Sequence, residues 1–135
     1  MSLVSMKQVL DHAQENKYGV GAFNVNNMEQ VQAIMLAASK TKSPVIIQAS
    51  RGALKYTNFV YLKHLMMAAV EDNPEIPVVM HLDHGDNLET VKKAIELGFT
   101  SVMIDASKES FKNNIQITKE VVAILCFAAH ALIEI

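Results

Sequence analysis

Short apolar runs alternate along this chain with longer segments in which apolar residues recur at the three- and four-residue spacing of a helix. The apolar runs predict strands over residues 20–23, 45–48, 78–82 and 101–104. The longer segments predict helices over residues 6–17, 28–39, 59–70 and 88–97, and from about residue 109 to the end. Asn26 or Asn27 is expected to cap the second helix, and Gly98 to end the fourth.

The order of these elements, one helix followed by four strand–helix units, predicts an α/β fold. The strand runs are apolar at consecutive positions, which is typical of parallel strands buried on both faces. Repeated units of this kind imply a parallel sheet with right-handed crossovers. Two architectures fit: a small open doubly wound sheet, and the first half of a TIM (β/α)8 barrel, which needs about 250 residues in full. Residues 1–135 are expected to form a single domain.

Composition narrows the class of protein. The chain has 135 residues, of which 50% are hydrophobic and 19% charged, so disorder is not expected. A net charge of −2 without a basic face argues against a nucleic-acid partner. The single cysteine excludes an intramolecular disulfide and a multi-cysteine metal cluster. The N-terminal segment is amphipathic and carries acidic residues, unlike a secretory signal. The apolar run over residues 121–133 is shorter than the roughly 20 residues of a membrane span, which predicts a buried segment in a cytoplasmic protein.

Polar residues follow each predicted strand. In both architectures the chemistry lies at the carboxyl ends of the strands. The densest cluster is His-Leu-Asp-His-Gly-Asp over residues 81–86. Asp83 is a candidate general acid/base or metal ligand, and His84 a candidate metal ligand if the chain turns at Gly85. The alternative is a hydrogen-bonded surface pair or a helix cap, and residues 81, 86 and 87 favour such structural roles.

The other strand ends offer further candidates. Asp105 follows an apolar strand, where a carboxylate is expensive unless it is paired or binds a metal. Ser50 can contact an anion or form an ordinary turn, and Asn24 can bind a substrate or lead into the next helix. Dinucleotide-binding, P-loop and serine-hydrolase motifs do not occur in the sequence, and no predicted strand contains a lysine for Schiff-base chemistry.

Several segments resemble the class II, zinc-dependent fructose-1,6-bisphosphate aldolases. They are YGVGAFNVNNMEQVQAI, SPVIIQASRGALKY, IPVVMHLDHGDNLETVKKAIELGFTSVMIDAS and the following ITKEVV. The resemblance implies a (β/α)8 barrel, usually dimeric or larger, that reversibly cleaves the bisphosphate into dihydroxyacetone phosphate and glyceraldehyde 3-phosphate. Enzymes acting on tagatose 1,6-bisphosphate share the same segments. The phosphorylated ketose would be the small-molecule partner, and the enzyme a cytoplasmic homo-oligomer.

The resemblance also implies roles for single residues. Asp83 would exchange a proton with the C4 hydroxyl, and His84 would be one of three histidines that hold the catalytic Zn²⁺. Asp105 matches a carboxylate at a second metal position. Ser50 matches a serine that contacts substrate, and Asn24 an active-site asparagine.

The chain departs from the family in length and at its end. It has about half the family's length, and residues 123–135 form an atypical C-terminal tail. We therefore expect a truncated chain with weak metal binding, little activity and a tendency to self-associate. Three hypotheses remain: an aldolase, an inactive or partner-dependent half-barrel fragment, and a small doubly wound binding domain.

Overall fold

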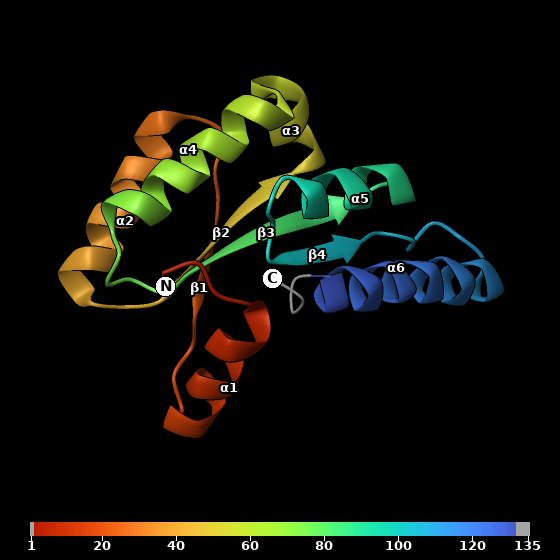
Figure 1. The fold of residues 1–135 in the computed structure, drawn as a ribbon, viewed down its shortest axis with the longest axis horizontal. Helices are drawn as coiled ribbons and strands as arrows, with labels where there is room; N and C mark the ends of the chain where they lie inside the picture. Colours follow the sequence, from red (N-terminus) through yellow and green to blue (C-terminus); the bar gives the residue numbers. More distant parts are fainter. Residues whose placement is uncertain (1, 132–135) are drawn as a thin grey trace.

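The protein is described by a computed structural model, which covers residues 2–131 and the side chains of residues 2–126. A parallel sheet of four strands carries helices along both of its faces (Figure 1). In chain order the elements are α1 (Met6–Asn16), β1 (Gly21–Asn24), α2 (Met28–Thr41), β2 (Val45–Ser50), α3 (Arg51–Thr57), α4 (Phe59–Asp72), β3 (Val78–Gly85), α5 (Leu88–Glu96), β4 (Ser101–Ile104) and α6 (Phe111–Ala131).

The predicted elements are confirmed, with boundaries that move by a few residues, except that the last four residues of the final predicted helix, 132–135, lie outside the described part. Asn27 caps α2, because its Oδ1 accepts a hydrogen bond from the Gln30 amide at 3.0 Å. Gly98, just beyond α5, has the left-handed φ of 89° expected of a helix stop. Helix α3 was not predicted, because it is only seven residues long and includes a glycine. Asn58, with a φ of 75°, ends α3 and caps α4.

The strand order distinguishes the two candidate architectures. The sheet runs β1-β2-β3-β4, so neighbours in the sheet are also neighbours in the chain. A doubly wound sheet contains a point where the strand order reverses, and this sheet contains none among its described strands. Consecutive parallel order is the order of a barrel segment.

The two faces of the sheet pack against different helices. Alternate residues Ile47 and Met80 of the central strands point into the main core, with the buried side chains of α2 to α6. The intervening residues Ile46 and Val79 form a second, smaller core with Val9 of α1. We call the face that carries Ile46 and Val79 the inner face, because it corresponds to the inside of a barrel. Helix α1 covers only one end of it.

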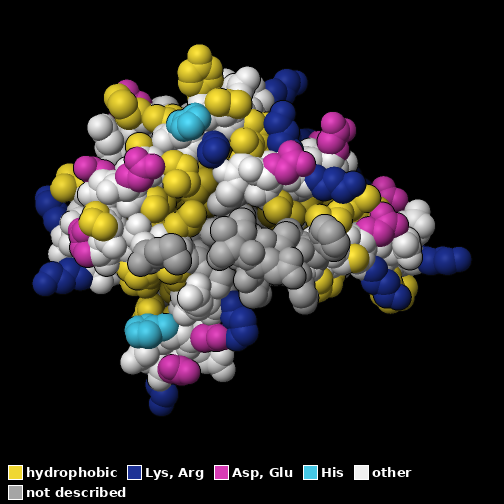
Figure 2. All heavy atoms as spheres, in the orientation of Figure 1, with side chains coloured by type: hydrophobic (Ala, Val, Ile, Leu, Met, Phe, Trp, Pro, Cys, Tyr) yellow, Lys and Arg dark blue, Asp and Glu magenta, His cyan; other side chains and the backbone are white. Residues whose placement is uncertain are grey.

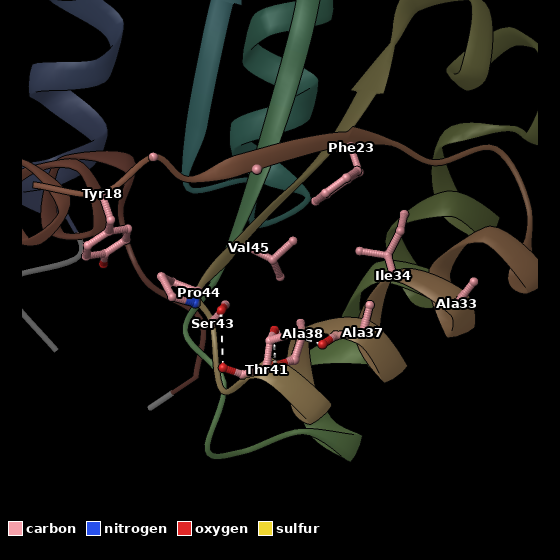
Figure 3. A pocket seen from close by; sticks show the side chains of 12 residues that line it. Tyr18, Phe23, Ala33, Ile34, Ala37, Ala38, Thr41, Ser43, Pro44 and Val45 are labelled. Carbon is pink, nitrogen blue, oxygen red and sulfur yellow. Dashed lines mark hydrogen bonds between the residues drawn. The ribbon is translucent and has the colours of Figure 1, made fainter.

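The central strands β2 and β3 are largely buried, whereas the edge strands are open. All four residues of β1 are exposed, and Phe23 retains 48% of its accessible surface. An apolar pocket of about 440 Å³ lies between β1 and α2, where Phe23 and Ile34 line its walls (Figure 3). Large apolar side chains are also exposed on the helical layer, among them Leu36 and Tyr61. Figure 2 shows hydrophobic and charged side chains interspersed on one face of the molecule.

Helix α6 contains the described part of the apolar C-terminal run. Of its described side chains only Val121 is buried, whereas Val122 is 51% exposed and those of residues 123 and 126 are exposed as well. The prediction of a buried run is therefore wrong for most of this part, because α6 packs with one side against α5 and leaves its other side open. Residues 132–135, and the side chains from residue 127 onward, lie outside the described part, so the atypical tail over residues 123–135 stays a prediction. Across the described residues, none of the helices has the length and apolar character needed to cross a membrane.

Candidate functional site

The candidate residues gather at the carboxyl end of the inner face. Parallel pairing places Asn24 beside Gln48, Gln48 beside His81, and His81 beside Ser101. One step further along the strands, Ser50 lies beside Asp83. The end of the inner face that α1 leaves uncovered therefore carries a polar row across all four strands.

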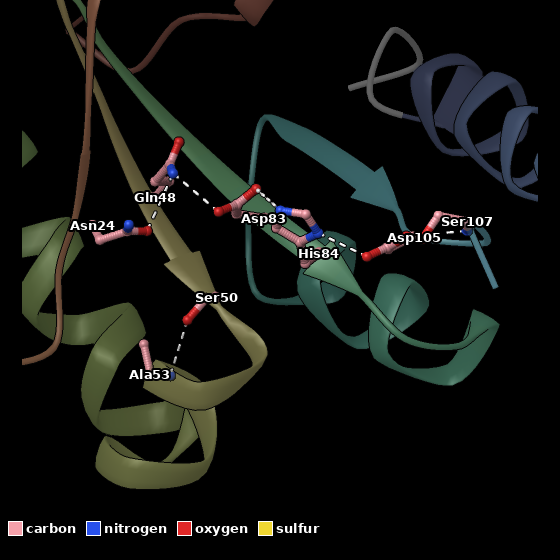
Figure 4. Close-up of polar contacts among 8 residues, drawn as sticks. All are labelled: Asn24, Gln48, Ser50, Ala53, Asp83, His84, Asp105 and Ser107. Atoms are coloured by element: carbon pink, nitrogen blue, oxygen red, sulfur yellow. Dashed lines mark hydrogen bonds and ion pairs between the residues drawn. The ribbon is translucent and has the colours of Figure 1, made fainter.

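Gln48 connects two of the predicted residues. Its Nε2 donates to Oδ1 of Asn24 at 3.1 Å and to Oδ2 of Asp83 at 3.0 Å (Figure 4). The three side chains come from β1, β2 and β3, so sheet register rather than sequence proximity brings them together. Asp83 is half-buried, with 21% of its side chain exposed.

His84 lies at the outer end of the same network. Its Nδ1 donates to Oδ2 of Asp105 at 2.8 Å, and its Nε2 lies 3.7 Å from Oδ1 of Asp83 (Figure 4). The side chain is 60% exposed, so the ring is accessible from solvent. The predicted pair of Asp83 and His84 thus faces a common space at the rim of the sheet, with Asp105 behind the ring.

The turn at this point differs from the expected one. His84 itself adopts the left-handed φ of 52°, and Gly85 has no positive φ. Gly85 is needed for another reason, because a Cβ there would lie 2.9 Å from the backbone oxygen of Met103. The left-handed residue interrupts the alternation of side chains, and the pairing of β3 with β4 shifts register between Leu82 and Gly85. The interruption turns the imidazole toward Asp83.

The electrostatics of the network follow from these contacts. The hydrogen bond to Asp105, reinforced by the charge of Asp83, raises the pKa of His84 above its ordinary value of 6.5. Hydrogen bonds from Ser107 and His84 hold the pKa of Asp105 well below its ordinary value of 3.8. His81 behaves differently, because burial lowers its pKa despite the nearby carboxylate of Asp83. Its Nδ1 lies 2.8 Å from the Ser101 hydroxyl, so the expectation that a neighbour satisfies His81 is confirmed.

A polar hollow of about 460 Å³ lies beside His84 and Asp105. Its other lining residues are Ser50, Arg51, Gly52, Asp86, Lys108 and Glu109. Ser50 stands at its edge, where its Oγ accepts a hydrogen bond from the Ala53 amide at 3.2 Å and caps α3. Of the two roles predicted for Ser50, the turn role is therefore present. The hollow also brings the cationic side chains of Arg51 and Lys108 near Ser50.

The structural roles expected next to the cluster are also present. Asn87 caps α5 by accepting a hydrogen bond from the Thr90 amide at 2.8 Å. Asp86 accepts a hydrogen bond from the Thr90 hydroxyl at 2.9 Å and lies 3.6 Å from the Arg51 guanidinium.

Gln48 and Ser107 are the polar partners that the sequence prediction missed. Gln48 ends the apolar run VIIQ, and its inward position in the strand alternation was a usable signal. Ser107 follows Asp105 in the chain, where its amide donates to the carboxylate at 3.1 Å. Its only signal was a short polar sequence after a strand, which is common in loops.

As a metal site this arrangement is partial. A histidine that ligates a metal usually donates its second ring N–H to a carboxylate, as His84 does to Asp105. Among the described residues, however, no group of three or more His, Cys, Asp or Glu side chains is placed to hold a metal ion. The donor set therefore fits one oriented imidazole ligand and not a complete site.

Comparison with known proteins points to a single family. The family model described as class-II fructose-bisphosphate aldolase matches residues 4–135. A protein named fructose-bisphosphate aldolase from Giardia intestinalis is 63% identical over 123 residues, and one from Pseudomonas aeruginosa is 54% identical over 130 residues. Each alignment covers 91% of this chain, but only 38% of the Giardia protein and 37% of the Pseudomonas protein. The chain thus spans little more than a third of these relatives' length.

Solved structures lead to the same family. The YdjI aldolase from Escherichia coli K12 superposes with a TM-score of 0.84 at 34% identity, over 90% of this chain and 47% of that protein. A putative fructose-1,6-bisphosphate aldolase from Coccidioides immitis gives a TM-score of 0.78 at 30% identity, over 86% of this chain and 45% of that protein. The fold is therefore about half of the neighbouring barrels, as expected from the strand order.

Proposed function

This chain belongs to the class-II fructose-bisphosphate aldolase family, and from that premise we propose that it supplies the first half of a metal-dependent aldolase site. The proposed reaction is the reversible cleavage of fructose 1,6-bisphosphate into dihydroxyacetone phosphate and glyceraldehyde 3-phosphate, a cytoplasmic step of glycolysis and gluconeogenesis. The observation that carries this proposal is the adjacency of the Asp83 carboxylate and the His84 imidazole, 3.7 Å apart at the rim of the sheet.

Asp83 is the proposed general base. Cleavage of the bond between C3 and C4 requires that the C4 hydroxyl lose its proton, and the same proton must return in the condensation direction. Gln48 occupies Oδ2 of the carboxylate, whereas Oδ1 faces the space next to His84. A substrate hydroxyl in that space would lie against Oδ1.

His84 is the proposed ligand for the divalent cation, and Zn²⁺ is the ion we expect. Asp105 holds the imidazole by its Nδ1, which leaves Nε2 on the side of Asp83 for a metal. When bound, the metal supplies a Lewis acid for the negative charge that develops as the carbon–carbon bond breaks. The other metal ligands would have to come from residues beyond those that the structure describes, because these contain no group of three or more suitable donors. A second cation at Asp105 would have to compete with His84 and Ser107 for that carboxylate.

Ser50 and Asn24 are proposed to contact the substrate. Ser50 shares its hollow with Arg51 and Lys108, which are the side chains proposed to meet a phosphate group. Three carboxylates, those of Asp86, Asp105 and Glu109, line the same hollow, and Arg51 lies 3.6 Å from Asp86, so the phosphate would have to compete for the cations. Asn24 has its Oδ1 engaged by Gln48, so its Nδ2 is the atom proposed to reach a sugar hydroxyl.

A second candidate is a half-barrel that works only with a partner. Two observations favour it: the described residues contain only a partial metal site, and both edge strands of the sheet are open. A homo-oligomer is one form of this proposal, supported by exposed apolar side chains such as Phe23 and Tyr61.

Aldolase activity with and without a complementing half tests both candidates. The 135-residue chain is assayed with Zn²⁺ in a coupled aldolase assay, alone and after co-production with the remaining C-terminal portion of the Giardia relative. We expect little turnover from the chain alone and clear turnover from the complemented pair. An inactive wild-type pair that is folded and associated contradicts the proposed function.

Two variants locate the chemistry. In the complemented pair, Asp83→Asn should lower kcat by about 10²- to 10⁴-fold, the usual contribution of a general base. The matched control Asp72→Asn, which makes the same change at an exposed residue of α4, should leave kcat unaltered.

Zinc binding by calorimetry tests the ligand. His84→Ala should abolish measurable binding to the chain, and Asp105→Asn should weaken it by about 10- to 100-fold. His64→Ala removes an exposed imidazole from α4 and should have no effect. Equal zinc affinity in the His84 and His64 variants would exclude His84 as the ligand.

A further inference from the structure

Gln48 contacts the proposed base, although it was not among the predicted site residues. We propose that Gln48 is the positioning residue of Asp83: it holds one carboxylate oxygen so that the other faces the substrate hydroxyl. This inference rests on the proposed function, because it assigns Gln48 a task within that site. Its evidence is the pair of hydrogen bonds from a single amide nitrogen to Asn24 and Asp83.

The chemistry of the three side chains fixes the orientation of the amide. Gln48 Nε2 carries two hydrogens, and its neighbours Asn24 Oδ1 and Asp83 Oδ2 are both acceptors. If the amide were rotated by 180°, its carbonyl oxygen would face two acceptors and both hydrogen bonds would be lost. The network therefore permits one arrangement, in which both N–H groups are used and Oδ2 of Asp83 is held at 3.0 Å.

The two oxygens of Asp83 have separate environments as a result. Oδ2 lies against Gln48, toward the middle of the inner face. Oδ1 lies 3.7 Å from Nε2 of His84, on the open side of the rim (Figure 4). A general base works only when its accepting oxygen is aligned with the proton it takes, and an error of about 1 Å can cost 100-fold in rate. A carboxylate at a strand end, 21% exposed, needs such support to keep one rotamer.

A purely structural role for Gln48 does not explain its position. The neighbouring row of the same face, Ala22, Ile46 and Val79, lies across the same three strands without any polar side chain. The strands are paired by their backbones in both rows, so no side-chain hydrogen bond is needed to join them. The row of Gln48 is polar, with Asn24 and His81 beside it, and Gln48 donates from this row to the carboxylate of Asp83 in the next one.

The test uses the full 135-residue chain complemented by the C-terminal portion of the Giardia relative. Gln48→Met keeps the length of the side chain and removes the donor. Gln48→Glu keeps the shape and places a further acceptor against two acceptors. The matched control is Gln116→Met on α6, because Gln116 Nε2 also donates to a carboxylate, Glu120, at 2.9 Å on an exposed surface.

A positioning role predicts a specific kinetic signature. Gln48→Met should lower kcat by about 10- to 100-fold, while KM and the melting temperature stay close to those of the wild type. Gln48→Glu should lower kcat further, and Gln116→Met should leave kcat unchanged. A purely structural role would instead lower the melting temperature, and a role in substrate binding would raise KM.

The outcomes separate this inference from the function on which it rests. If the wild-type pair is active and Gln48→Met retains the wild-type kcat, the positioning role is wrong and the aldolase assignment stands. If Gln48→Met raises KM alone, Gln48 contacts substrate and does not position Asp83. An inactive wild-type pair overturns the proposed function itself, and the assignment of Gln48 with it.

Discussion

The two ends of the inner sheet face are built from the same strands and serve different purposes. At the amino end, Ile46 and Val79 are buried against Val9 of α1. At the carboxyl end, two and four residues further along the same strands, Gln48 and Asp83 face an open rim. The same strands run through both ends; the ends differ in side-chain type, in the cover of α1 and in the register shift of β3 near its carboxyl end. Burial at one end stabilises the sheet, and this allows the other end to expose the charged groups of the proposed site.

The largest expected change in stability comes from exchanging an apolar and a charged residue between the two ends of the inner face. Val79→Asp places a carboxylate in a fully buried apolar site and should cost more than about 4 kcal/mol of unfolding free energy, so the chain unfolds. Asp83→Val makes the reverse change at the open end and should alter stability by only about 1 kcal/mol. Circular dichroism melting of both variants measures this. Equal destabilisation by the two changes would erase the distinction between the ends.

A smaller loss of unfolding free energy is expected when α1 loses its contact with the sheet. Ile46→Ala removes an apolar side chain that is 5% exposed and should lower the unfolding free energy by about 2–5 kcal/mol. Leu36→Ala truncates a side chain of the same size at a position of α2 that is 58% exposed, and should cost much less. Urea denaturation compares the two, and an Ile46 variant no less stable than the Leu36 variant would contradict the role of α1.

Ser50 is the residue of the polar end that should also affect stability. Ser50→Ala removes the N-cap of α3 and should cost about 1 kcal/mol of unfolding free energy. Ser39→Ala, within α2, removes no cap and should leave the melting temperature near that of the wild type. If Ser50→Ala melts like Ser39→Ala, the hydroxyl does not cap α3 in solution.

The smallest effect is the pH dependence of the exposed pair formed by His84 and Asp105. Because the pKa of His84 is raised, its contribution to the stability of the folded state is complete below pH 6.5. That contribution is lost as the pH rises through the pKa of the folded state. Because the pKa of Asp105 is lowered, its contribution to the stability of the folded state is complete above pH 3.8. That contribution is lost as the pH falls through the pKa of the folded state. The difference in unfolding free energy between the wild type and Asp105→Asn should therefore be greatest between pH 3.8 and 6.5.

Proton NMR titration checks the same pair directly. Asp105→Asn removes the main cause of the raised pKa, so the titration midpoint of His84 should move down, toward 6.5. Asp72→Asn, the same change at an exposed residue of α4, provides the control and should leave the His84 midpoint in place. An unchanged His84 midpoint in Asp105→Asn would show that the two side chains are not in contact.

The amino-acid sequence by itself determined the order of strands and helices, and it pointed to Asp83 and His84 as candidate site residues. Both are local properties: hydrophobic periodicity is contained within each segment, and Asp83 and His84 are covalent neighbours at the end of an apolar run. The seven-residue α3 escaped prediction, because its period is too short to stand out.

Only the tertiary structure decided how the site is connected. Gln48 reaches Asn24 and Asp83, which are 24 and 35 residues away in the chain, through the register of three strands. His84 meets Asp105 because the left-handed turn falls on His84 and not on the glycine that follows it. Strand register and a single backbone torsion depend on the packing of the whole sheet, and a local pattern of residues does not contain that information.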